Sequence, residues 1–257
     1  MLIIKETTWP IEYSNMFCNN EGGCPIPLYH GTRRHALTAT RQERELFYNA
    51  CDVIMKFAQS LVKSNGFDNE KYHEYRVTKN RYFLDTMVYL YGSRKCQYGD
   101  FYVTSSLCGA ISFAYNVGGE LGQWAYSQCV GFRELGFELD EETKNAAIIV
   151  EEEYDKYAKS EKVVLVYGGV RLSDLTFEGD KSDLVDDERK MSLLKKGVDT
   201  DVVRMNANFI LNNMDKYTAN VITEKDFRSC ILFLTMVTDV DELIAEHNLY
   251  FYPRFDF

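Results

Sequence analysis

The chain has 257 residues, of which 46% are hydrophobic, and it carries a formal net charge of −10. A hydrophobic fraction this large predicts a sizeable core and excludes a chain that is disordered throughout. The negative charge argues against a standing electrostatic grip on nucleic acid or on an anionic membrane surface. Brief contact through a local basic patch stays open.

The seven cysteines have no C-x-x-C pair and no spacing typical of a zinc site. The first ten residues, MLIIKETTWP, are too polar for the apolar region of a secretory signal. No run of about 18 apolar residues occurs that would span a membrane. We therefore expect a soluble, reduced, cytoplasmic protein without a bound metal ion and without a membrane partner.

The first part of the chain is predicted to be mainly helical. Apolar residues recur there at three- and four-residue spacing, as on one face of a helix. Helices are expected at residues 41–64, 70–92, 121–134 and 140–159. The last of them begins after Asp140, which is a good N-cap. A short strand ends at Leu28-Tyr29, and a second covers residues 101–104. Ser105 or Ser106 is expected to cap a helix through Ala110, Phe113 and Ala114.

The second part is predicted to be mainly strands. One is expected at 163–167, continued after Gly168-Gly169 by residues 170–175, and residues 178–190 form an acidic loop. Further strands are expected at 202–204, 209–211 and 249–255, and residues 231–237 are ambiguous between strand and helix. Helices before strands predict an α+β fold. We treat residues 1–257 as a single domain.

The segment Leu28-Tyr29-His30-Gly31-Thr32 places a histidine and a glycine at the end of an apolar run. Glycine suits a position where a backbone closely approaches a ligand, because it has no Cβ atom. Taken alone, the histidine is more simply a structural residue near a turn.

A second motif begins at Tyr102, 72 residues after His30. Ala110 lies eight positions and Phe113 eleven positions after this tyrosine, one helical turn apart. Two aromatic faces can enclose a flat cationic ring between them. The alternative is an amphipathic helix whose aromatic residues only fill the core.

Together the two motifs resemble the NAD-binding segments of ADP-ribosyltransferases with a His-Tyr-Glu signature, which include diphtheria toxin and the poly(ADP-ribose) polymerases. The resemblance implies a split β-sheet core and NAD as co-substrate, bound through Tyr29, His30, Gly31 and Thr32. His30 would bond the adenosine-side ribose, and the Gly31 backbone would hold the carboxamide. Tyr102 and Phe113 would enclose the nicotinamide. Many family members have serine where Ala110 stands, so Ser105 or Ser106 is the candidate for that amide contact.

The third signature residue of the family, a glutamate, has no direct counterpart. The best match to its strand is Asn208-Phe209-Ile210-Leu211, with asparagine at the acidic position. Asn206 would share the face of Asn208, and Glu178 and Glu224 are the alternative acids. An asparagine accepts a hydroxyl proton but brings no negative charge, which is compatible with mono- rather than poly-ADP-ribosylation.

The expected function is therefore transfer of ADP-ribose from NAD to a macromolecular acceptor, with His30, Tyr102 and Asn208 as catalytic residues. Residues 41–95 are expected to form a helical insertion beside the pocket. The acceptor, protein or nucleic acid, stays open. Small relatives of the family act as toxins, toxin–antitoxin components or phage-defence proteins, which implies an antitoxin or inhibitor protein as partner. The alternatives are an inactive NAD-binding module and a tRNA 2′-phosphotransferase.

Overall fold

The computed structural model describes residues 3–6, 27–63, 88, 91, 101–177, 186–198, 204–207 and 218–228. The chain divides into two compact units, each built from separate stretches of sequence. The sheet unit comprises residues 1–32, 100–115 and 161–257, and the helical unit comprises 33–99 and 116–160. The α+β class expected from the sequence is confirmed.

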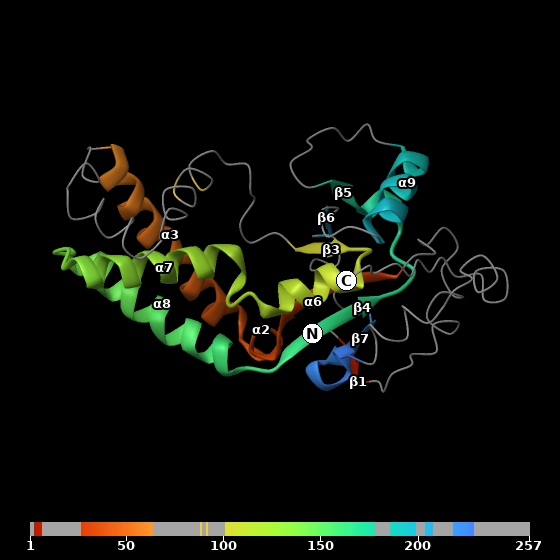
Figure 1. Cartoon of the computed structure of the whole chain (residues 1–257), viewed down its shortest axis with the longest axis horizontal. Coiled ribbons are helices and arrows are strands. Elements are labelled where there is room, and N and C mark those ends of the chain that lie inside the picture. Colours follow the sequence, from red (N-terminus) through yellow and green to blue (C-terminus); the bar gives the residue numbers. More distant parts are fainter. Residues whose placement is uncertain are drawn as a thin grey trace. The chain divides into compact units, whose positions relative to one another are not determined.

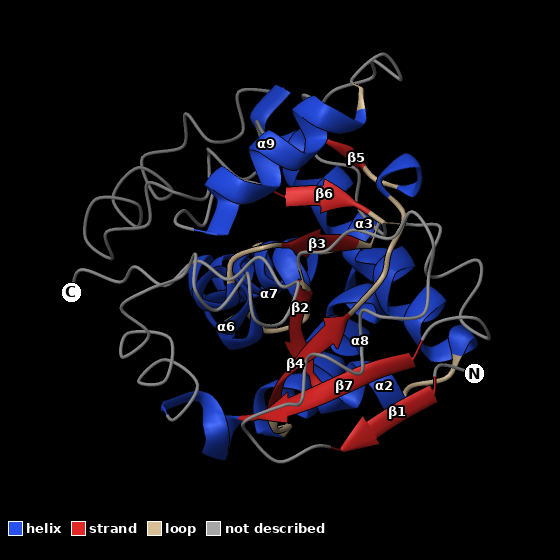
Figure 2. Cartoon of the chain, turned by 90° about the vertical axis from the view of Figure 1, so that its right-hand side faces the viewer, coloured by secondary structure: helices blue, strands red, loops and turns tan. Residues whose placement is uncertain are grey.

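The sheet unit contains a seven-stranded sheet with the order β1-β7-β4-β2-β3-β6-β5 (Figure 2). Its strands are β1 (Ile3–Glu6), β2 (Leu28–Arg33), β3 (Tyr102–Thr104), β4 (Lys162–Tyr167), β5 (Thr176–Phe177), β6 (Arg204–Asn206) and β7 (Thr218–Thr223). β1 and β7 are parallel, whereas β7 with β4, β2 with β3, β3 with β6 and β6 with β5 are antiparallel.

Strand β4 is fully buried from Val163 to Tyr167, and the sequence explains why. In β4, every residue from Val163 to Tyr167 is at most 1% exposed. A continuous run of β-branched and apolar residues suits a strand that is covered on both faces. Helix α6 (Leu107–Tyr115) packs against β3 and β4. Helix α9 (Asp187–Val198) packs against β3 and the short 3₁₀ helix η2 (Leu172–Asp174).

The helical unit is built around three long helices. They are α3 (Arg41–Lys63), α7 (Gly119–Leu135) and α8 (Glu141–Lys159), which pack against one another (Figure 1). The short helix α2 (Arg34–Thr38) precedes α3 and packs on α8. The buried stripe of α3 contains Phe47, Ala50, Cys51, Ile54, Met55 and Ala58, at the spacing of one helix face. Asp140 caps α8 by accepting a hydrogen bond from the Thr143 amide, as predicted.

Two expectations for the second half of the chain are wrong. Residues 170–175 do not continue β4, because the chain turns at Gly169 (φ 67°) and forms η2, where Arg171 pairs with Asp174. Residues 187–190 are not loop but the first turn of α9. The Asp186 carboxylate accepts the Arg189 amide there, so the acidic run caps a helix.

Most of the other expected helices and strands are confirmed, and several lie outside the described residues. The helices at 41–64, 121–134 and 140–159 and the strands at 101–104 and 163–167 are confirmed. Strand β6 begins at Arg204, at the end of the expected 202–204 segment, and β7 was not expected. Of the helix expected at 70–92, the structure describes residues 88 and 91, which are both helical. The expectations for residues 209–211, 231–237 and 249–255 lie outside the described residues. The helical unit contains α3, from the expected insertion, together with α7 and α8. The single domain stays a prediction.

Candidate functional site

His30 lies on β2 and is held by its neighbours on β3. Its Nδ1–H donates to the carbonyl oxygen of Tyr102 at 2.7 Å, and its ring stacks on Phe101 with 4.2 Å between centroids. A carbonyl only accepts, so in the neutral ring the Nε2 atom carries the lone pair. Burial lowers the pKa of His30 below its ordinary value, and the hydrogen bond to Tyr102 opposes this in part. At neutral pH, His30 therefore offers an uncharged hydrogen-bond acceptor.

Gly31 is the point where β2 touches α6. A Cβ atom at this position would lie 1.7 Å from the carbonyl oxygen of Ala110 and 2.8 Å from the amide nitrogen of Ala114. Both atoms belong to the helix backbone, so no side-chain rotation can make room. Glycine is thus required for the contact between strand and helix, and the ligand approach expected from the sequence stays a prediction.

The sheet parts beside Gly31. Among the described residues, the register between β2 and β3 consists of one pair, Tyr29 with Thr104. A continued antiparallel ladder would bring His30 opposite Val103 and then Gly31 opposite Tyr102. Instead, the Tyr102 carbonyl accepts its hydrogen bond from the His30 ring. β2 and β3 therefore separate at the position where the family resemblance expects the nicotinamide carboxamide.

Four half-buried side chains gather on the face of the sheet that α6 covers. Opposite residues of an antiparallel pair project to the same face. Tyr102 is opposite Asn206, and Thr104 is opposite Arg204 (Figure 2 shows β3 beside β6). Phe113 comes from α6, and the Arg204 guanidinium lies 5.4 Å from the centroid of its ring. Because side chains alternate along a strand, His30 and Phe101 project to the opposite face.

Three of the other candidate residues are turned into the interior. Tyr29 is 3% exposed and Ala110 is fully buried. The buried Ser105 hydroxyl donates to the carbonyl oxygen of Leu194 in α9 at 2.5 Å. Ser106, rather than Ser105, caps α6, because its Oγ accepts the Gly109 amide at 3.0 Å. Thr32 is half-buried near the end of β2.

The residues considered for the third signature position are dispersed. Asn206 is the residue opposite Tyr102. Glu224 forms an ion pair with Lys162, at the start of β4. Tyr167, at the other end of β4, contacts Phe101, and Phe101 stacks on His30. His30 therefore lies near the Tyr167 end of β4. Five residues of strand separate the two ends by roughly 16 Å. Asn208 and Glu178 lie outside the described residues.

Arg204 is the site residue that sequence reasoning missed. The signal was present, because Arg204 is two residues before Asn206 and alternation gives both the same face. What the sequence could not supply is the register of β6 against β3, which sets Arg204 beside Phe113 of α6.

The arginines after Gly31 serve local structure in the helical unit. Arg33 donates to the carbonyl oxygen of Ser160 at 3.1 Å, and Arg44 donates to the carbonyl oxygens of Ala36 and Ala39. Arg41 pairs with Glu45 one turn along α3. These contacts bond Arg33, Arg41 and Arg44 to carbonyl and carboxylate groups within the helical unit.

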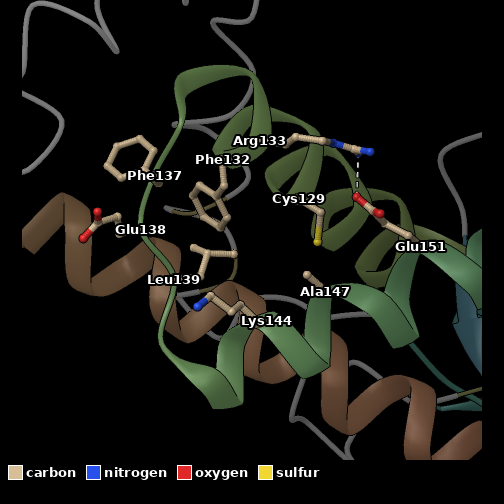
Figure 3. Close-up of a pocket in the computed structure, with 9 residues that line it drawn as sticks. All are labelled: Cys129, Phe132, Arg133, Phe137, Glu138, Leu139, Lys144, Ala147 and Glu151. Carbon is tan, nitrogen blue, oxygen red and sulfur yellow. Dashed lines mark hydrogen bonds and ion pairs between the residues drawn. The ribbon is translucent and has the colours of Figure 1, made fainter.

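The helical unit also contains an open hollow of about 530 Å³ at the turn between α7 and α8 (Figure 3). Phe132, Phe137 and Leu139 line it, together with the Arg133–Glu151 ion pair. Burial raises the pKa of the Cys129 thiol in its wall to about 12, which keeps the thiol protonated and unreactive. None of the residues expected to bind NAD lines this hollow.

Comparisons with protein-family models, with curated proteins and with solved structures give no match for this chain. Within the described residues, no three His, Cys, Asp or Glu side chains are grouped so that they could hold a metal ion. The helices of the described part are all too short or too polar to cross a membrane.

Proposed function

We propose that the chain is an NAD-dependent mono-ADP-ribosyltransferase. In this reaction, an acceptor nucleophile bonds to C1′ of the nicotinamide ribose as the bond from C1′ to nitrogen breaks. Nicotinamide leaves with the bonding electrons, and the acceptor loses a proton. The observation that carries the proposal is the parting of β2 and β3 beside Gly31, with His30 and Tyr102 at the gap.

Each residue at the gap has chemistry that suits the co-substrate. The neutral His30 ring, with Nδ1–H committed to Tyr102, accepts a ribose hydroxyl at Nε2. The aromatic rings of Tyr102 and Phe113 suit the flat, cationic nicotinamide ring of NAD. Residues that hold this ring and orient the ribose favour a transition state in which positive charge develops on the sugar.

The register favours Asn206 over Asn208 for contact with the ribose, because Asn206 is directly opposite Tyr102. Its amide can bond a ribose hydroxyl, but it adds no negative charge to stabilise the developing cation. Slow turnover and transfer of single ADP-ribose units follow from this. The split β-sheet core of the ADP-ribosyltransferases remains part of the same proposal.

A second candidate is a binding module that holds NAD without turning it over. Asn206 is the observation that favours it, since an amide stands where the resembling family uses a carboxylate. The two candidates make the same prediction for binding and opposite predictions for release of nicotinamide.

The biological setting is proposed from family-level analogy alone. A toxin, toxin–antitoxin or phage-defence role in the cytoplasm would require a protein or nucleic-acid acceptor and a neutralising antitoxin or inhibitor. The identity of the acceptor decides between these roles.

The test measures NAD binding by calorimetry and nicotinamide release by chromatography on the purified chain. Tyr102→Ala should abolish both, whereas Tyr102→Phe, which keeps the aromatic ring, should keep binding within about threefold. Glu224→Gln is the matched control, because Glu224 lies at the far end of β4 and should be silent. A folded wild-type chain that neither binds NAD nor releases nicotinamide would overturn the proposal.

A further inference from the structure

We propose that the hollow at the turn between α7 and α8 binds a small amphiphilic carboxylate. The apolar body of this ligand fills the hollow, and its acid group pairs with Lys144. None of the residues expected to bind NAD lines the hollow, so the inference does not depend on the proposed function.

The hollow has the size and the lining of a small-molecule site. Its volume is about 530 Å³, and such sites range over roughly 300–1,000 Å³, with mainly apolar linings and a few polar groups. The apolar part of its lining consists of Cys129, Phe132, Phe137, Leu139 and Ala147. The rings of Phe132 and Phe137 meet edge to face, with 5.9 Å between centroids. Phe137, Leu139 and Ala147 are half-buried, so an apolar ligand that covers them removes apolar surface from water.

One of the four charged residues of the lining is suited to hold an acid group. Arg133 and Glu151 neutralise each other, because their side chains form an ion pair at 2.6 Å. Glu138 is exposed and leaves the connecting chain on the side opposite Leu139 (Figure 3). Lys144 is also exposed, and within the described part of the chain no carboxylate lies within ion-pair distance of its ammonium. Lys144 is therefore the cation that a ligand can pair with.

The acids around Lys144 leave this role open. Asp140, four residues before it, attracts Lys144, but its carboxylate already accepts the Thr143 amide at 2.8 Å. Glu141 and Glu142 stand in the same first turn of α8 and do not line the hollow. A lysine stem can lie along an apolar wall while its ammonium stays in water. The acid group of the ligand thus meets Lys144 at the mouth, while its body lies on the aromatic lining.

The experiment compares three probes with the same apolar body and different charge. They are 4-phenylbutyrate, which is an anion, the neutral 4-phenylbutanamide, and 4-phenylbutylamine, which is a cation. Backbone amide shifts in ¹H–¹⁵N NMR spectra locate the contact, and titrations give the dissociation constants.

The variants separate the charge from the shape of the hollow. Lys144→Gln removes the ammonium and Lys144→Arg keeps a cation, whereas Ala147→Leu fills the hollow with a larger side chain. Lys159→Gln is the matched control, because Lys159 is an exposed lysine at the other end of α8 that does not line the hollow. Circular dichroism confirms that each variant is folded.

We expect wild type to bind phenylbutyrate at least about threefold more tightly than the amide, with shifts at the lining residues. Lys144→Gln should remove this preference without weakening the amide, and Lys144→Arg and Lys159→Gln should keep it. Ala147→Leu should weaken phenylbutyrate and the amide alike.

A folded wild-type chain whose lining residues show no shift with phenylbutyrate would overturn the inference. So would an amine that binds as tightly as phenylbutyrate, since Glu138 or Glu151 would then govern the choice of ligand. A preference for the acid that survives in Lys144→Gln, or phenylbutyrate binding that is unchanged in folded Ala147→Leu, would overturn it as well.

Discussion

The substitution Gly31→Ala tests the contact on which the site is built. An added methyl group would lie 1.7 Å from the Ala110 carbonyl oxygen, whereas real Cβ atoms essentially never come within 3.0 Å of another atom. To reach that separation, α6 has to move by about 1.3 Å from β2. The displaced helix carries Phe113, which is proposed to contact the nicotinamide ring, so binding of NAD should fall along with stability.

The size of the destabilisation by Gly31→Ala depends on the kind of atom that the added methyl group contacts. Overpacking against side chains costs about 1–3 kcal/mol, and a rigid backbone oxygen places Gly31→Ala at about 3 kcal/mol. For a chain of this size, that lowers the melting temperature by roughly 6–12 °C. Gly136→Ala is the control: its methyl meets nothing within 4 Å, and only the left-handed backbone (φ 64°) is strained. That strain costs about 1 kcal/mol, or roughly 2–4 °C.

The assay is thermal unfolding followed by circular dichroism, with NAD binding measured on the same samples. The double variant Gly31→Ala/Ala110→Gly should not recover stability, because the struck atom belongs to the backbone and remains in place. A melting temperature for Gly31→Ala no lower than that of Gly136→Ala would show that α6 accommodates the methyl group without strain. Rescue by Ala110→Gly would contradict the contact with the backbone oxygen.

Three further predictions concern single side chains. The pKa of His30 is lower in the folded chain than in the unfolded chain, so the unfolded chain binds the proton at a higher pH. The stability that the neutral ring contributes therefore falls as the pH drops through the unfolded value of about 6.5 and on toward the lower folded value. Between pH 7.5 and 5.5, the free energy of unfolding measured in urea should fall less for His30→Asn than for wild type, and equal decreases would contradict this. Ser106→Ala removes the cap of α6 and should cost about 1–2 kcal/mol in urea unfolding, whereas Ser106→Thr keeps the hydroxyl and should cost less. Asn206→Glu places a carboxylate opposite Tyr102 and should speed nicotinamide release at least about tenfold. An unchanged rate would indicate that residue 206 does not contact the ribose.

Helices with long periodic faces could be predicted from the sequence because their signals are local. The stripe through Phe47, Cys51, Ile54 and Ala58 and the cap at Asp140 both arise within a few residues of chain. Ser106 was one of two equally good caps, and only the structure separates it from Ser105, which bonds Leu194 in a distant helix.

The errors have physical causes that the chain itself contained. The acidic run before α9 was assigned to a loop, although Asp186 and the acids that follow form a helix start with lysines at the other end. Strand β7, Thr-Ala-Asn-Val-Ile-Thr, was not expected, although four of its six residues are Thr, Val or Ile, which favour strands; it pairs with β4 and β1.

The candidate site could be predicted only in part, because motifs report spacing and not register. The spacing singled out His30, Gly31, Tyr102 and Phe113. In the structure β2 and β3 are neighbours and Phe113 lies on α6, but alternation along the strands turns the His30 side chain to the face opposite Tyr102. The pairing of Tyr102 with Asn206 depends on residues more than a hundred positions apart, and no local pattern contains it.

The proposed activity is best measured as transfer of ADP-ribose to a macromolecule. The purified chain is incubated with cell lysate and NAD labelled on its adenylate half, and the products are digested separately with protease and with nuclease. We expect label on a macromolecule that one digestion releases, together with free nicotinamide, and neither product with Tyr102→Ala. A folded wild-type chain that gives no label and no nicotinamide would contradict it, and NAD binding without either product would establish the binding module instead.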